Sequence, residues 1–211
     1  MELKTKKIIF FDFDGTIADT LKAFMMVNNN HYKEYGTKYI TDEDVPKLKH
    51  MKDFEILRYL DINVIEFFLI SRKFLKQVSN FMPSAPVFDG MLELLTDLHN
   101  LGHVIVIVSR NSVPNIKKFF KANKVEHMNN IYSEGFFTKK DKIIDRVLKR
   151  HKLTIIDAVL IGDRLTDFES AKKAEIDYIY VSWGYGVPSK EQAEELKYRV
   201  DSPLELRKLL I

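Results

Sequence analysis

The alternation of short apolar blocks with longer amphipathic blocks is the feature that most restricts the fold of this chain. The apolar blocks are typical of buried strands, and they are Lys7–Asp12, Val104–Val108, Asn130–Ser133, Ala158–Ile161 and Tyr178–Val181. A helix-type pattern precedes each block after the first, at Met91–Leu101, Asn115–Ala122, Asp141–His151 and Asp167–Ala174. Because strands joined through helices form right-handed βαβ units, we predict an α/β fold: a Rossmann-like parallel sheet with helices on both faces.

One long segment, residues 19–83, interrupts this alternation. It contains no convincing strand, and its helix-type patterns are Leu21–Tyr35, Phe54–Leu60 and Val64–Phe81. Such a segment is too long for a loop, so we predict a small helical domain at 19–83, inserted into a core made of residues 1–18 and 84–211. The expected hinges are Asp19-Thr20 at its beginning and Pro83–Pro86 at its end, where two prolines stiffen the chain.

The composition is that of an ordinary globular protein and excludes several classes. The chain has 211 residues, and its 33 Lys and Arg against 30 Asp and Glu leave a formal charge of only +3, which argues against a dedicated nucleic-acid binder. The absence of Cys excludes a disulfide scaffold, a thiolate metal site and thiol catalysis. Of the six His residues, His99 and His103 are four apart, but Gly102 ends the helix pattern between them and no carboxylate is suitably spaced, which argues against a zinc site.

The sequence shows no segment suited to a membrane or to export. Its longest apolar stretches, such as Val104–Val108, are far shorter than the roughly 20 residues of a membrane-spanning helix. Residues 1–7 lead directly into the first strand block, which leaves no room for the apolar core of a signal peptide. We therefore expect a cytoplasmic protein with no membrane partner and no nucleic-acid partner.

Acidic residues follow two of the predicted strands. Asp12 and Asp14 lie at the end of the first block, and Asp163 and Asp167 follow Ala158–Ile161. In an open parallel sheet, the carboxyl ends of the strands share one edge, and ligands bind there near the point where the strand order reverses. Four carboxylates at that edge repel one another unless a hard cation neutralises part of their charge, and Mg²⁺ prefers such oxygen ligands. The sequence therefore predicts a Mg²⁺ site formed by these four acids.

The pair Asp12 and Asp14 is also suited to phosphoryl transfer. Side chains two residues apart in an extended segment share one side, so one carboxylate can attack phosphorus while the other handles protons. Gly15 permits a sharp turn that brings backbone N–H groups towards a phosphate oxygen, and Thr16 is expected to cap that turn, so both residues are candidates for phosphate binding.

Further phosphate-binding groups are expected after the second strand block. Ser109 and Asn111 follow Val104–Val108, where a hydroxyl, an amide and the N–H groups of the next helix start can bind a phosphoryl oxygen. Arg110 lies between them and is either a third phosphate ligand or only a salt-bridge partner.

A cluster of lysines opens the helix-type pattern before Ala158–Ile161. An ammonium group from Lys139, Lys140 or Lys142 can offset the charge of the phosphoryl group and of the nucleophile. We favour Lys140, and Lys139 and Lys142 stay open because a lysine-rich helix start is usually a solvated face.

In their order, these motifs resemble those of the haloacid dehalogenase superfamily of hydrolases. The matching elements are Asp12-Phe-Asp14-Gly15-Thr16-Ile17-Ala18-Asp19-Thr20, then Ser109, then a lysine, then Gly162-Asp163 with Asp167. The resemblance covers essentially the whole chain, and a helical cap inserted after the first motif is typical of the superfamily's phosphoglycolate-phosphatase-like branch. Val181-Ser-Trp-Gly184-Tyr-Gly186 is similar to a segment of that branch and supports the subgroup rather than a catalytic role.

The resemblance implies a Mg²⁺-dependent phosphatase that acts on a small phosphorylated metabolite through an aspartyl-phosphate intermediate. Asp12 would be the nucleophile, with its other oxygen on the metal. Asp14 would be the general acid and base, with its backbone carbonyl on the metal. Ser109 and Lys140 would hold the phosphoryl group. Asp163 would be a metal ligand, and Asp167 would support the surroundings of the metal.

Two departures from the family pattern bear on the substrate. Relatives that cleave carbon–halogen bonds lack the second Asp of the first motif, so Asp14 argues for a phosphate ester. Many capped relatives carry a Gly in the substrate-facing loop of the cap, whereas the corresponding Pro46–Asp53 has none, which argues against phosphoglycolate itself. Lys49, His50 and Arg58 are candidates for contact with the leaving group.

Two other functions stay open at the level of sequence. A phosphosugar mutase of the same fold would share the aspartyl-phosphate intermediate, but it would need a cap able to hold a bisphosphate. A non-catalytic switch protein that binds phosphate or metal would also use clustered acids. In each case we expect a monomer or a small homo-oligomer.

Overall fold

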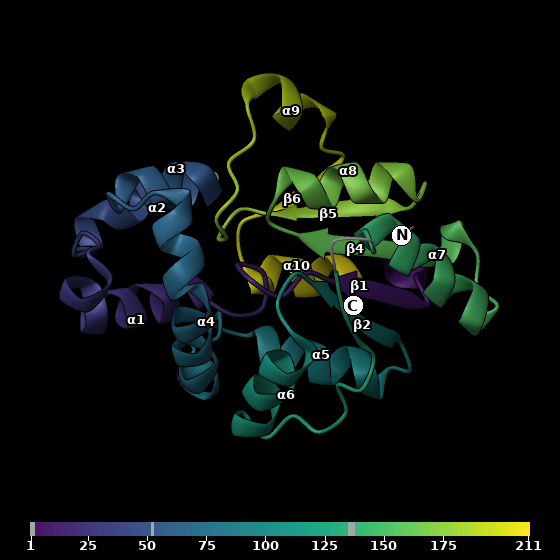
Figure 1. Cartoon of the computed structure of the whole chain (residues 1–211). Coiled ribbons are helices and arrows are strands. Elements are labelled where there is room, and N and C mark those ends of the chain that lie inside the picture. The colour runs from purple at the N-terminus through teal and green to yellow at the C-terminus, as the bar shows by residue number, and fades with distance from the viewer. Residues whose placement is uncertain (1–2, 52, 135–137) are drawn as a thin grey trace.

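The computed structural model is built around a six-stranded sheet in which every strand pair is parallel (Figure 1). It describes residues 3–51, 53–134 and 138–211. The strands are β1 Ile8–Phe11, β2 Val104–Ser109, β3 Ile131–Ser133, β4 Ala158–Gly162, β5 Asp177–Val181 and β6 Tyr198–Val200. The helices are α1 Thr20–Tyr35, α2 Val45–His50, α3 Asp53–Tyr59, α4 Val64–Phe81, α5 Met91–Asn100, α6 Val113–Ala122, α7 Lys140–His151, α8 Leu165–Lys173, α9 Lys190–Glu195 and α10 Pro203–Leu210. None of these described helices is long and apolar enough to cross a membrane.

The order of the strands creates one reversal point. Across the sheet the order is β3-β2-β1-β4-β5-β6, so the chain builds outward from β1 on one side and then returns to its other side at β4. Ligands of such sheets bind at the carboxyl ends of the strands beside the reversal, here β1 and β4. Phe11 pairs in register with Ile161, so Asp12 and Gly162, the next residue of each segment, reach this edge together.

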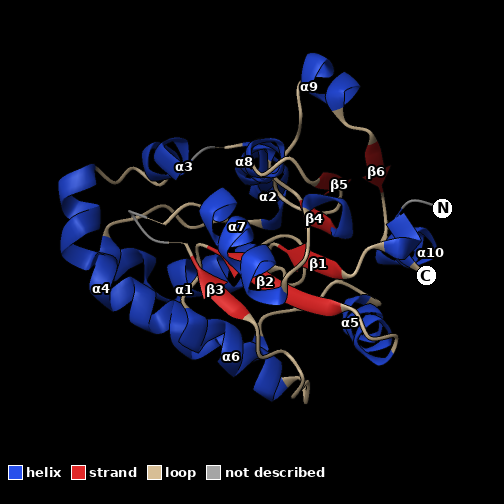
Figure 2. Ribbon diagram, turned by 90° about the vertical axis from the view of Figure 1, so that its right-hand side faces the viewer, coloured by secondary structure: helices blue, strands red, loops and turns tan. Residues whose placement is uncertain are grey.

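Apolar side chains cover both faces of the sheet, because successive residues of a strand point to opposite sides. On one face, Ile9 and Phe11 pack with residues of α5, α6 and α10. On the other face, Ile8 and Phe10 pack with residues of α7 and α8. Figure 2 shows these helices on the two sides of the strands. The predicted Rossmann-like α/β fold is therefore confirmed.

The predicted elements have ends within two residues of the observed ones, but three α-helices and one strand of the described residues were not predicted. These are α2, α9, β6 and α10. β6 is a three-residue strand at the edge of the sheet in which Val200 alone is buried, so it is too short to show a recognisable alternation. Only residues at the N-terminus of α10 indicate this helix. The hydroxyl of Ser202 caps it by accepting the N–H of Glu205, and Pro203 occupies its first turn.

The helices α1 to α4 have apolar packing of their own. One cluster contains Met25, Ile40, Leu48, Leu60 and Ile62, and a second contains Val27, Tyr35 and Phe74. α1 contacts α4 through an edge-to-face pair, Phe24 and Phe74, whose ring centroids are 5.1 Å apart. Figure 1 shows these helices beside the sheet rather than over its faces.

The two connections between these helices and the sheet lie side by side. The N–H of Asp19 donates to the carbonyl of Pro86 at 2.8 Å, and the N–H of Phe88 donates to the carbonyl of Ile17 at 3.2 Å. Ala18 and Val87 form an isolated antiparallel bridge between them. The predicted hinges, Asp19-Thr20 and Pro83–Pro86, fall at this paired crossing.

Candidate active site

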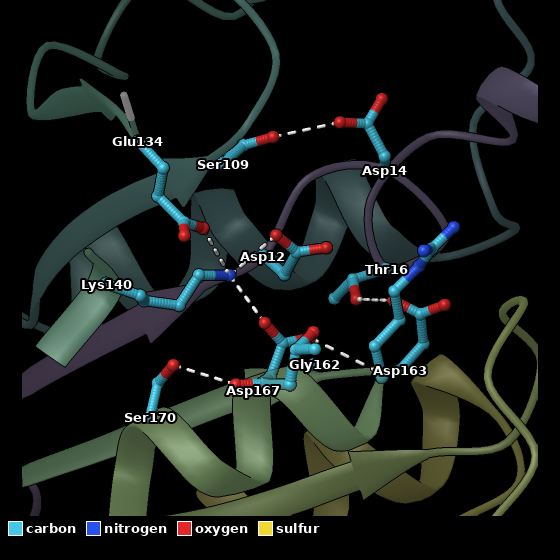
Figure 3. Close-up of polar contacts among 12 residues, drawn as sticks. Asp12, Asp14, Thr16, Ser109, Glu134, Lys140, Gly162, Asp163, Asp167 and Ser170 are labelled. Atoms are coloured by element: carbon cyan, nitrogen blue, oxygen red, sulfur yellow. Dashed lines mark hydrogen bonds and ion pairs between the residues drawn. The ribbon is translucent and has the colours of Figure 1, made fainter. Parts of the chain in front are cut away.

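Three buried carboxylates meet at the carboxyl edge of β1 and β4 (Figure 3). Asp12 follows β1, Asp163 follows β4, and Asp167 lies in the first turn of α8. One oxygen of each carboxylate lies within 4.8 Å of the other two. Buried like charges at this separation destabilise the fold unless cations compensate them, so the charges around the cluster decide whether it is tolerated.

Lys140, the first residue of α7, is the cation at the centre of this site. Its side chain is only 2% exposed, and its Nζ lies 2.8 Å from Asp12 Oδ1, 2.6 Å from Asp167 Oδ1 and 3.5 Å from Glu134 Oε1. Burial alone would lower the pKa of Lys140, but the three neighbouring carboxylates together raise it above its usual value. The amine therefore stays charged at any physiological pH.

The other two candidate lysines face solvent. Lys139 is exposed, and the side chain of Lys142 is 69% exposed with its amine 3.7 Å from Asp141. Successive residues of a helix point about 100° apart, so only one of three neighbouring lysines can face the sheet edge. Of the three left open by the sequence, Lys140 is the one that the fold brings to the acids.

Asp12 is held between this cation and the other acids. Its N–H donates to the carbonyl of Ile161 at 2.8 Å, which continues the pairing of β1 with β4. Burial raises the pKa of Asp12 well above its ordinary value; Lys140 opposes that shift, and the charges of Asp167 and Asp163 add to it. A divalent cation beside these oxygens would relieve the same repulsion. The residues present therefore fit a hard cation that prefers oxygen ligands.

Asp163 is fully buried and held through both of its carboxylate oxygens. The hydroxyl of Thr16 donates to Oδ1 at 3.2 Å, and the N–H of Tyr185 donates to Oδ2 at 2.6 Å. Burial, followed by the charge of Asp167, raises the pKa of Asp163 to about 6. The side chain of Thr16, which we expected at a phosphate, thus contacts an acid of the cluster instead.

Two glycines allow the backbone to close around Asp163. Gly15 has φ +86°, and a Cβ on it would lie 2.5 Å from Asp163 Oδ2. A Cβ on Gly184 would lie 2.2 Å from the Cβ of Asp163. The segment around Gly184, which the sequence linked only to a subgroup, therefore positions an acid of the site.

Asp14 points its carboxylate away from the other acids, towards the end of β2 (Figure 3). Its oxygens accept hydrogen bonds from the hydroxyl of Ser109 at 2.9 Å and from the side-chain amide of Asn111 at 3.0 Å. The N–H of Asn111 also donates to the hydroxyl oxygen of Ser109 at 3.0 Å. The sequence predicted four gathered carboxylates. Three are gathered, because these neutral donors draw the fourth to the other side of the cavity.

A cavity of about 430 Å³ opens onto these groups. Its lining residues are Asp12, Asp14, Ser109, Arg110, Glu134, Lys140, Arg164, Thr166, Asp167 and Ser170. Arg110 is an exposed residue of this lining. The sequence reasoning missed Glu134, although the signal was present, since this acid follows a predicted strand as Asp12 does. Arg164, Thr166 and Ser170 carried no comparable signal.

The cap candidates have different positions. The side chain of Lys49 extends from α2 to the segment after β5, where its amine donates to the carbonyl of Trp183 at 3.4 Å. Arg58 is exposed and lines neither this cavity nor the one described below. Lys52 and the side chains of His50 and Asp53, within the stretch Pro46–Asp53, lie outside the described residues.

The fold and the site together define a parallel α/β protein with an acidic, lysine-balanced pocket at the reversal point of its sheet. A family model of the haloacid dehalogenase-like hydrolases matches residues 9–181, and the chain belongs to this family. The predicted superfamily and the prediction of a hydrolase are therefore confirmed.

Several of the individual relatives are phosphatases. A phosphoglycolate phosphatase from Synechococcus elongatus is 24% identical over 178 residues, which is 84% of each chain. A phosphoserine phosphatase from Methanocaldococcus jannaschii is 25% identical and covers 81% of this chain and 83% of its own. A solved structure of a predicted phosphoglycolate phosphatase from Haemophilus somnus 129pt shares the fold, with a TM-score of 0.82 at 16% identity over 98% of this chain and 99% of that one. These matches confirm the predicted phosphoglycolate-phosphatase-like branch.

Replacing Gly184 with Ala should weaken divalent-cation binding, because the new Cβ would lie 2.2 Å from that of Asp163 and would push its carboxylate aside. We expect the Mg²⁺ concentration that half-saturates the rise in melting temperature to increase at least about tenfold. Gly102→Ala is the control: its φ of +86° strains an Ala there, but nothing lies within 4 Å of the new Cβ, so this variant loses stability without contact with the acids. The same Mg²⁺ response in both variants would contradict the role given to Gly184.

Asp163→Asn should stabilise the metal-free protein at pH 7. The pKa of Asp163 is about 6 in the folded protein against an ordinary 3.8, so the folded state binds this proton more tightly than the unfolded chain does. The resulting stabilisation is full below about pH 3.8 and is lost as the pH rises through about 6, so at pH 7 the buried charge costs up to about 3 kcal/mol.

Urea unfolding in EDTA measures this difference. We expect the Asn variant to be the more stable protein at pH 7 and its advantage to disappear near pH 4, where the wild-type acid is protonated. A variant that is less stable than the wild type at pH 7 would show that the carboxylate does not bear this cost.

Proposed function

We propose that this hydrolase is a Mg²⁺-dependent phosphatase that acts on small phosphorylated metabolites through an aspartyl-phosphate intermediate. The observation that carries the proposal is the pair Asp12 and Asp14 on one cavity, the first bonded to Lys140 and the second to Ser109. One carboxylate faces a cation and the other faces neutral donors. Two carboxyl groups in unlike surroundings suit the separate tasks of nucleophile and acid–base catalyst.

Mg²⁺ suits the oxygen donors of this site. The carboxylates of Asp12 and Asp163 and the backbone carbonyl of Asp14 would hold the ion, and Asp167 would support its surroundings. When bound, the ion neutralises charge on the acids and on the phosphoryl oxygens. Support comes from the three clustered carboxylates and from the raised pKa values of Asp12 and Asp163.

In the first half of the reaction, a carboxylate oxygen of Asp12 forms a bond to phosphorus as the bond from phosphorus to the ester oxygen breaks. Protonated Asp14 gives its proton to the leaving oxygen, so the product departs as a neutral alcohol. Ser109, Asn111 and Lys140 contribute a hydroxyl, an amide and an ammonium group that stabilise the charge on the phosphoryl oxygens. Gly15, Thr16 and Arg110 would complete the phosphate site through backbone N–H groups and one exposed cation.

In the second half, a water molecule attacks the phosphorus of the aspartyl-phosphate. Asp14, now ionised, accepts the proton of that water, and the bond between phosphorus and Asp12 breaks. Inorganic phosphate leaves, Asp12 is again a carboxylate, and Asp14 is again protonated. Before the substrate binds, hydrogen bonds from Ser109 and Asn111 hold Asp14 on the cavity, and these two donors would then turn to the phosphoryl oxygens.

Residues 19–83 would act as the cap of this enzyme, and residues 1–18 and 84–211 as its catalytic core. Separate apolar clusters in the helical segment and the paired crossing at Ala18 and Val87 support this division. A cap joined by two adjacent connecting segments can swing to admit the substrate and then close to exclude bulk water.

Asp12→Asn should abolish steady phosphate release, because an amide cannot form the intermediate. We expect kcat to fall by at least about a thousandfold while the circular dichroism spectrum is unchanged. The measurement is phosphate release from a panel of metabolite phosphates with Mg²⁺, and EDTA should abolish it in the wild type. Appreciable turnover by the variant would refute the mechanism, and an isomerised sugar phosphate with little free phosphate would identify a mutase instead.

Lys140→Met should reduce both activity and stability, since it leaves Asp12 and Asp167 buried without their cation. We expect kcat to fall at least about a hundredfold and the free energy of unfolding to fall by about 3–5 kcal/mol. Lys142→Met is the matched control on the same helix, and its stability should change by less than about 0.5 kcal/mol. Equal effects in the two variants would remove Lys140 from the proposed site.

A further inference from the structure

A second cavity, of about 310 Å³, lies among the helices α1, α3 and α4. Asp14 and Arg164 line both this cavity and the one that holds Asp12, so the two cavities meet at these residues. In the mechanism above, the leaving oxygen takes its proton from Asp14. The part of the substrate beyond that oxygen therefore points towards the second cavity, which we call the cap chamber.

The walls of the cap chamber are apolar. α1 contributes Leu21 and Phe24, α3 contributes Ile56 and Leu57, and α4 contributes Ile70 and Phe74. The chamber lies between the two apolar clusters of the helical segment, and its volume is at the lower end of the roughly 300–1,000 Å³ that is usual for small-molecule sites.

The polar residues of the chamber are bonded to the protein itself. At one end, the hydroxyl of Thr37 donates to Asn28 Oδ1 at 2.7 Å, and the amide of Asn28 donates to the carbonyl of Lys38 at 2.8 Å. At the other end, the hydroxyl of Tyr185 accepts the N–H of Leu21 at 2.8 Å. A polar leaving group would lose its hydration here and find these partners already engaged, which is unfavourable.

Charge in the chamber also disfavours an acidic leaving group. Among its described lining residues, Arg164 is the one cation, and it shares the mouth with the carboxylate of Asp14. A carboxylate such as that of phosphoglycolate would pass this acid and enter apolar surroundings. An isolated ionised group is strongly disfavoured there.

We infer that the substrate is a phosphate monoester of an apolar alcohol or phenol, whose hydrocarbon part fills the cap chamber while its phosphoryl group lies at Asp12. The inference rests on the proposed phosphatase function and names the substrate class of the same site. Its driving force is the removal of hydrocarbon from water, with Phe24 and Phe74 offering flat surfaces for an aryl or alkyl group.

The test uses ethyl, butyl and hexyl phosphate with the Mg²⁺-loaded wild-type enzyme and measures kcat/KM by phosphate release. Full burial of each added methylene should raise kcat/KM roughly fourfold. Propyl phosphate, which has nearly the shape of phosphoglycolate, should exceed phosphoglycolate in kcat/KM at least about tenfold.

A matched pair of variants locates the effect. Ile56→Gln places an amide in the chamber and should flatten the dependence on chain length. Ile65→Gln makes the same exchange at a residue of α4 that is 74% exposed and outside the chamber lining, and it should leave the dependence unchanged. The wild-type series decides the question even where Ile56→Gln fails to fold.

The possible failures can be told apart. Hydrolysis with a kcat/KM that is independent of chain length, or a preference for phosphoglycolate over propyl phosphate, overturns the substrate class and leaves the phosphatase function intact. If no ester is hydrolysed, p-nitrophenyl phosphate included, then the proposed function fails and the assignment of the chamber fails with it.

Discussion

The buried contact of Lys140 with Asp12 and Asp167 is the interaction on which the rest of the site depends. Without that ammonium group, the acids at the ends of β1 and β4 would repel one another in a region nearly closed to water. The ammonium group offsets part of this charge and leaves the cluster with a net negative charge. The same contact joins the first residue of α7 to the segment after β1 and to the first turn of α8.

Asp163 links this acidic centre to the helical segment. The N–H of Tyr185 donates to Asp163, and the hydroxyl of the same Tyr185 accepts the N–H of Leu21 at the start of α1 and donates to Asp19 at 3.0 Å. Tyr185 thus contacts an acid of the cluster through its backbone and the beginning of α1 through its side chain.

Much of this arrangement was predictable, because parallel sheets follow strict rules of connection. The predicted strands and helices of the core begin and end within two residues of the observed ones. The carboxyl groups of Asp12 and Asp163 lie at the edge of the sheet that the strand pattern indicates. The edge strand β6 was missed because three residues with a single buried side chain carry no readable period. Glu134 directly follows the predicted strand Asn130–Ser133, so its place at the same edge of the sheet was predictable from the strand pattern.

The sequence by itself determined the class of chemistry: the order of Asp12, Ser109, a lysine and Asp163 along a βαβ chain places oxygen acids, a hydroxyl and a cation at one edge of a sheet. Only the tertiary structure decided that Lys140 is the lysine involved, that Asp14 turns to Ser109 and Asn111, and that the cap encloses an apolar chamber. The physical reason is geometric. Strand order follows from local periodicity, whereas the direction of a side chain and the shape of a cavity depend on contacts between residues far apart in the chain.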